Sequence, residues 1–94
     1  MFQDRQVPKF ALGQVVITTN ALSHLEMSEV EAAVHRHALG DWGDVCPDDK
    51  KENELSLTSG LRLLSAYQAQ NGVRFWIITE ADRSLTTVLL PEDY

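Results

Sequence analysis

One stretch decides the fold: residues 61–90, LRLLSAYQAQNGVRFWIITEADRSLTTVLL. It contains Asn71-Gly72 between two apolar runs. This pair is the strongest short-range signal of a β-hairpin, because a two-residue type I′ turn needs positive φ at both central residues. A second turn is expected at residues 81–84, ADRS. The stretch therefore predicts a three-stranded antiparallel meander.

The expected turn at Asn71-Gly72 also fixes the strand register. Counting outward from a two-residue turn places Tyr67 opposite Trp76, and the second turn places Ile77 opposite Val88. One sheet face is then apolar and is expected to form the core beneath a helix. Its predicted members are Leu64, Ala66, Phe75, Ile77, Val88 and Leu90.

The opposite face of this sheet mixes aromatic, charged and hydroxyl side chains. Tyrosine and tryptophan are enriched in protein interfaces and in their energetic hot spots. The face is therefore interpreted as a partner-binding surface, and the alternative that a second helix or the N-terminal segment covers it stays open. The candidate partner-binding residues are Tyr67, Arg74, Trp76, Ile78 and Thr87.

Length and composition limit the remaining possibilities. With 94 residues, the chain has room for one domain with a modest core. A net charge of −6 opposes binding to nucleic acid, which depends on Lys and Arg neutralising phosphates. No apolar run is long enough to span a membrane, and no signal peptide is apparent. A single cysteine, Cys46, fits a reducing compartment, so a cytoplasmic location is expected.

The rest of the chain is expected to supply a strand and two helices. Residues 10–19 contain a short β-branched run that predicts either a strand at the edge of the sheet or an extended segment leading to the first helix, whereas residues 1–9 are expected to fray. Ser28 and Glu31 form a capping-box pattern that predicts a helix ending at Gly40. The apolar side chains of this helix are spaced to line one face, formed by Val30, Ala33, Val34 and Ala38. Pro47 predicts the first turn of a second helix over residues 47–57. The expected fold is α+β, with the N-terminal strand and two helices packed on the meander.

The segment Gly40-Asp41-Trp42-Gly43-Asp44 is the most unusual in the chain. Two glycines and two acids bracket one indole ring. The preferred interpretation is a tight loop whose Trp42 closes one end of the core. The alternative is a loop that presents Asp41 or Asp44 to a ligand.

Catalytic and metal-binding patterns are sparse. His35 and His37 are two residues apart and point to different sides of a helix, unlike the pair four residues apart in helical zinc sites. No metal site and no cofactor are therefore expected. The strongest enzymatic alternative is a metal-free RNA-cleaving toxin of RelE-like architecture, with His37, Arg62 and Arg83 as acid–base and phosphate-stabilising groups. Such toxins are usually basic, and this chain is acidic.

Several segments taken together resemble small bacterial proteins of plasmids and integrative elements, described as "plasmid-related" and sometimes as a type I restriction subunit M. The resemblance covers residues 10–94. It implies a genomic context and no established activity, and 94 residues cannot hold a methyltransferase domain with its cofactor pocket. The segments that carry it are LGQVV at 12–16, GDWGD at 40–44, ENEL at 52–55, LSAY at 64–67, WIITEADRS at 76–84, TT at 86–87 and PE at 91–92.

The sequence therefore favours a non-enzymatic accessory protein of a mobile element that binds another protein or itself. A third possibility is an acidic anti-restriction or anti-defence protein that mimics nucleic acid. That role would need an array of carboxylates along one surface, formed by Asp41, Asp44, Asp48, Asp49, Glu52 and Glu54.

Overall fold

The computed structural model describes residues 7–94, so part of the segment expected to fray, residues 1–6, lies outside the described residues. At the start of the described part, the Lys9 backbone N–H donates to the Ala38 carbonyl at 2.8 Å. No helix in residues 7–94 has the length and apolarity needed to cross a membrane. The elements in chain order are β1 (Gln14–Ile17), α1 (Thr19–His24), α2 (Met27–Ala38), α3 (Pro47–Ser59), β2 (Leu63–Gln68), β3 (Arg74–Thr79), β4 (Leu85–Leu89) and the 3₁₀ turn η1 (Pro91–Asp93).

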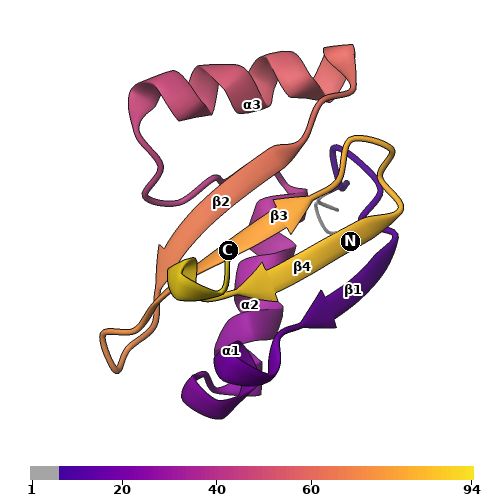
Figure 1. Cartoon of the computed structure of the whole chain (residues 1–94). Coiled ribbons are helices and arrows are strands. Elements are labelled where there is room, and N and C mark those ends of the chain that lie inside the picture. Colours follow the sequence, from indigo (N-terminus) through magenta and orange to yellow (C-terminus); the bar gives the residue numbers. More distant parts are fainter. Residues whose placement is uncertain (1–6) are drawn as a thin grey trace, which may run out of the picture.

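The sheet has four strands in the order β1-β4-β3-β2 (Figure 1). Strands β2, β3 and β4 form antiparallel neighbours, and β1 adds to β4 in parallel. The α+β class is confirmed. The predicted three-stranded meander is only part of the sheet, because β1 joins its edge next to β4, as one of the two interpretations of residues 10–19 expected.

Helices α1 and α2 cover one face of the sheet (Figure 1). The apolar spacing of α2 places Val30, Ala33 and Ala38 in the core, as expected of an amphipathic helix. The capping prediction was wrong, because α2 begins after Glu26 and Ser28 lies inside it. The predicted end is confirmed, since Gly40 follows the last turn with φ of 82°.

Helix α3 lies along β2 (Figure 1). It begins at Pro47, as predicted, and extends two residues beyond the predicted end, to Ser59. Gly60 ends it in the left-handed conformation, with φ of 76°. Only Asn53 and Ser56 are buried, so this helix keeps the hydrophilic surface that its composition indicated.

The β2–β3 register was predicted wrongly by one residue. The Ala69 N–H donates to the Val73 carbonyl at 2.9 Å, and the Gly72 N–H donates to the Ala69 carbonyl at 2.9 Å. Gly72 has φ of 90°, whereas Asn71 has no positive φ. The loop therefore has three residues, with one left-handed position, instead of a two-residue type I′ turn. Tyr67 consequently pairs with Phe75 and not with Trp76.

This shift exchanges the two faces of β2, because side chains alternate along a strand. Leu63, Ser65 and Tyr67 are buried, and Leu64 and Ala66 move to the other face. The β3–β4 register is confirmed, with Ile77 opposite Val88. The core beneath α1 and α2 is formed by Ala21, Leu25, Val30, Ala33, Tyr67, Ala69, Phe75, Ile77, Val88 and Leu90.

The outer edge of β2 is covered by side-chain and loop contacts instead of a full strand. Gly43 forms an isolated parallel bridge with Ala66. Asn53 of α3 pairs with both main-chain groups of Leu64: its Nδ2 donates to the carbonyl at 2.7 Å, and its Oδ1 accepts from the N–H at 3.0 Å. These contacts satisfy a strand edge that would otherwise be open to pairing.

Replacing Asn53 with alanine is expected to lower the free energy of unfolding by about 2 kcal/mol, because two main-chain groups lose their partners. Urea denaturation measures the change. The control is Thr58→Ala, at an exposed position of the same helix where the hydroxyl donates only to a local carbonyl. Its cost is expected to stay below about 0.5 kcal/mol. Equal costs for the two variants would contradict the role given to Asn53.

Candidate protein-binding face

The face of the sheet opposite α1 and α2 is the best candidate for a functional surface. We call it the open sheet face, and Trp76 and Thr87 are partly exposed on it. Ile78 lies between them in the sheet and is buried among its neighbours. Arg74 is exposed at the start of β3, and alternation places it on this side. Strand pairing and alternation give the open sheet face these members: Gln14, Val16, Leu64, Ala66, Gln68, Arg74, Trp76, Ile78, Leu85, Thr87 and Leu89.

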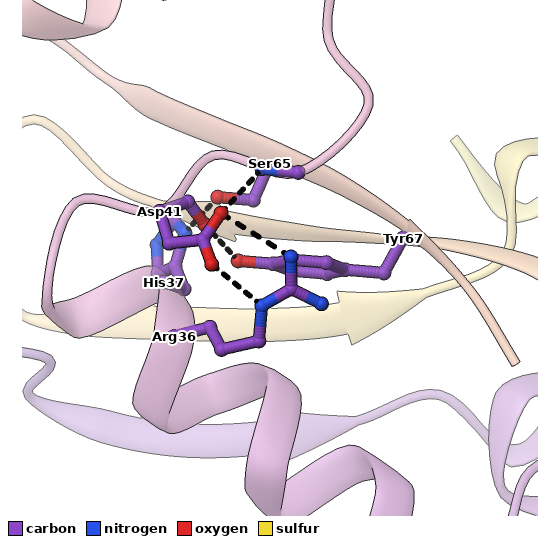
Figure 2. Close-up of polar contacts among 6 residues, drawn as sticks. Arg36, His37, Asp41, Ser65 and Tyr67 are labelled. Carbon is purple, nitrogen blue, oxygen red and sulfur yellow. Dashed lines mark hydrogen bonds and ion pairs between the residues drawn. The ribbon is translucent and has the colours of Figure 1, made fainter.

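Tyr67 does not belong to this face, which corrects the predicted tyrosine–tryptophan pair. Its ring is buried on the α2 side and its hydroxyl donates to the Asp41 carbonyl (Figure 2). The Arg36 guanidinium lies over the ring at 4.7 Å. Burial raises the pKa of the Tyr67 hydroxyl to about 12. Tyr67 therefore stabilises the packing of the loop after α2.

A different tyrosine accompanies Trp76. The ring of Tyr94, which is 67% exposed, meets the Trp76 ring edge-on with 5.6 Å between centroids. Arg62 Nη2 donates to the Tyr94 hydroxyl at 2.6 Å, and its guanidinium lies over the same ring. Tyrosine, tryptophan and arginine are the residues most enriched in interface hot spots. We call these three residues the aromatic corner.

The C-terminal turn that carries Tyr94 is anchored to the start of α1. Asp93 accepts hydrogen bonds from the Thr18 hydroxyl at 2.7 Å and from Asn20 Nδ2 at 3.0 Å. It also accepts from the Leu90 N–H at 3.0 Å, and these bonds lower the pKa of the Asp93 carboxyl, the Leu90 contact most of all. Sequence reasoning missed Tyr94, because its position depends on contacts between the C-terminal turn and the start of α1, which are far apart in the sequence.

A groove of about 450 Å³ adjoins the open sheet face, between α3 and the segment that leads into β2. Two leucines on its rim are prominently exposed: Leu55 at 65% and Leu61 at 60%. Arg62 belongs both to the groove and to the aromatic corner. The groove and the face therefore form one continuous surface. The groove is lined by Asp49, Glu52, Asn53, Leu55, Ser56, Leu61, Arg62 and Leu64.

A buried polar network lies on the other side of the sheet. His37 Nδ1 is 2.6 Å from the Ser65 hydroxyl, and its Nε2 is 2.8 Å from the Thr79 hydroxyl (Figure 2 shows the His37–Ser65 contact). Thr79 contacts Thr86 at 2.8 Å, and Thr86 donates to the Leu12 carbonyl at 2.7 Å. Since Thr86 uses its proton on Leu12, Thr79 donates to Thr86 and accepts from His37. Neutral His37 therefore carries its proton on Nε2.

The contact between Ser65 and His37 has the spacing of a nucleophile and its base, but neither side chain reaches the surface. Both residues have 0% exposure, and burial, followed by the nearby charge of Arg83, lowers the pKa of His37 to about 4. A substrate would have no access to either group, so the network joins α2 to the sheet. The burial of His37 could have been predicted from the sequence, because His37 lies seven residues after Val30, on the buried side of α2.

The three residues of the RNA-cleavage alternative do not form one site. His37 is buried beneath α2, whereas Arg62 belongs to the aromatic corner. Arg83 donates to the carbonyls of Leu61 and Ser56 at 2.7 and 2.8 Å, and so joins two chain segments. Acid–base catalysis needs its groups within reach of one substrate, and this arrangement does not provide that.

The loop at residues 40–44 is held in place by contacts with α2, α3 and β2. Trp42 is 4% exposed, and its Nε1 donates to Glu54 at 2.8 Å. Asp41 accepts two bonds from Arg36, at 2.7 and 3.2 Å, and this pairing lowers the pKa of the Asp41 carboxyl (Figure 2). Asp44 is exposed, and its backbone N–H donates to the Ala66 carbonyl at 2.7 Å.

The acidic residues considered for nucleic-acid mimicry are partly engaged elsewhere. Asp41 and Glu54 have the partners described above, and Lys50 and Lys51 interrupt the acids of α3.

Cys46 is free and exposed. Within residues 7–94, no three histidine, cysteine, aspartate or glutamate side chains are grouped as metal ligands.

Comparisons with models of protein families, with curated proteins and with solved structures give no match.

Proposed function

We propose that this protein is a non-enzymatic binding module whose open sheet face and adjoining groove contact a partner protein. The observation that supports this most is the partly exposed Trp76 next to the exposed Tyr94, on the sheet face that α1 and α2 leave uncovered. Burying two aromatic rings and the neighbouring apolar side chains would supply the free energy of association.

A different protein is a better partner than a second copy of this chain. Each copy carries a net charge of −6, so two copies repel each other at long range as they approach. A partner with apolar and basic residues would be attracted to the same surface. Given the resemblance of residues 10–94 to plasmid-related proteins, we propose that this partner is encoded by, or acts upon, a mobile genetic element.

The binding proposal is tested by selecting ligands from a displayed library of short random peptides. Selected peptides are expected to shift the NMR indole N–H signal of Trp76 and to leave that of buried Trp42 unchanged. Trp76→Ala is expected to weaken their binding by at least tenfold, the loss typical of a hot-spot residue. Calorimetric titration measures the affinity.

The control is Leu22→Ala, which removes an apolar side chain from α1 that is more exposed than Trp76; Leu22 is 51% exposed. It is expected to leave peptide binding unchanged. Selection of no peptide, or equal losses in the two variants, would overturn the proposed function. A concentration-dependent dimer in light scattering, abolished by Trp76→Ala, would instead identify a second copy as the partner.

A further inference from the structure

The groove beside the open sheet face has an uneven distribution of charge. Asp49, Glu52 and Ser56 are three or four residues apart along α3, so they share the helix side that forms one wall. The opposite wall contains Leu61 and Arg62. The groove is thus lined by two carboxylates and one guanidinium, and that guanidinium is already bonded to Tyr94.

Apolar surface lies next to the two carboxylates. Leu55 and Leu61 are mostly exposed on the rim, and Leu64 lies partly buried where the groove meets the sheet. A long side chain with an aliphatic stem and a cationic end matches this arrangement, because its stem can cover leucines while its charge stays near carboxylates and water. Lysine and arginine are the two amino acids with this chemistry.

We infer that the groove receives a lysine or arginine side chain of the partner protein, next to apolar residues that lie on the open sheet face. This inference rests on the proposed function and specifies the partner as a basic, amphipathic polypeptide segment. The volume of about 450 Å³ has room for one long side chain together with part of an apolar neighbour.

Charge complementarity distinguishes this occupant from the others. An acidic segment would meet Asp49 and Glu52 in the groove and the net charge of −6 over the whole chain. A second copy would present the same acidic groove. A neutral apolar segment would leave the two carboxylates without a partner and would gain nothing from them.

The test uses the peptides selected from the random library, in paired forms with each basic residue either kept or replaced by glutamine. The basic forms are expected to bind about tenfold more tightly than the glutamine forms at low salt, and the ratio is expected to fall as salt is added. In the double variant Asp49→Asn, Glu52→Gln, the ratio is expected to approach one. The unshifted Trp42 indole signal verifies that this variant is folded.

The matched control is Glu26→Gln, Glu31→Gln, which removes two exposed charges from the start of α2, away from the groove. It is expected to keep the preference for basic peptides. Equal binding of the basic and glutamine forms, with Trp76→Ala still weakening both, would overturn this inference and leave the proposed function standing. If the control variant also loses the preference for basic peptides, the preference arises from net charge, and the inference that the groove binds a basic side chain is overturned. Absence of any binding peptide would overturn both proposals.

Discussion

Replacing Gly43 with alanine is expected to lower the free energy of unfolding by about 3–5 kcal/mol. Gly43 has φ of 73°, and a Cβ atom placed there would lie 2.0 Å from the Ala66 carbonyl oxygen. The same atom would come within 2.9 Å of the Tyr67 ring. A backbone oxygen cannot rotate away as the end of a flexible side chain does. The substitution would therefore push the loop off the edge of β2.

Gly60→Ala is the matched control for this prediction. Gly60 has nearly the same backbone conformation, with φ of 76°, but nothing lies within 4 Å of an added Cβ atom. It is expected to lose only the cost of placing alanine in the left-handed region, about 1–2 kcal/mol. Urea denaturation of both variants measures the difference. Equal losses would show that the loop does not pack against β2 as described.

Acidification from pH 6.5 to pH 4 is expected to lower the free energy of unfolding by about 3 kcal/mol, through His37 alone. The pKa of this histidine is lowered from 6.5 to about 4 in the folded chain, by burial first and by Arg83 second. In this window the unfolded chain binds a proton at residue 37 and the folded chain does not. The contribution of His37 to the free energy of unfolding is therefore retained above pH 6.5 and is lost as the pH falls towards 4.

The variant His37→Gln is expected to remove this pH dependence, although it also lowers stability at neutral pH by disturbing the bonds to Ser65 and Thr79. The control is His35→Gln, at an exposed position on the same helix, which should keep the full dependence. Chemical denaturation at several pH values measures the slope. The carboxyl groups with lowered pKa, such as Asp41 and Asp93, lose most of their contributions below about pH 3.8, so they add little to the slope in this window. An unchanged slope in His37→Gln would contradict the buried, neutral histidine.

Local signals in the sequence were sufficient for most elements. Pro47 and Gly60 mark the ends of α3, and the apolar spacing of α2 identifies its buried side. The hairpin also forms where Asn71-Gly72 predicted it. The Asn-Gly pair alone did not determine the loop length. A two-residue type I′ turn needs two left-handed residues, whereas a three-residue loop needs only one, and here Gly72 supplies it. The one additional residue in the loop shifts the register of β2 and so exchanges its predicted buried and exposed faces.

The candidate site was only partly accessible to sequence reasoning, for the same physical reason. Trp76 and Thr87 share a face because the β3–β4 register was correctly predicted. Tyr67 was placed with them through the register error in β2. Tyr94 and the groove along α3 arise from contacts between distant segments, which neither periodicity nor turn residues encode.

Site-specific photo-crosslinking tests the central claim, that the open sheet face is the binding surface, most directly. A photoreactive phenylalanine analogue is introduced at Thr87, in the middle of this face, and separately at Leu22 on α1, in cells that naturally produce the protein. The account predicts a discrete adduct with another protein from position 87 and none from position 22. No adduct from position 87, or the same adduct from both positions, would contradict it.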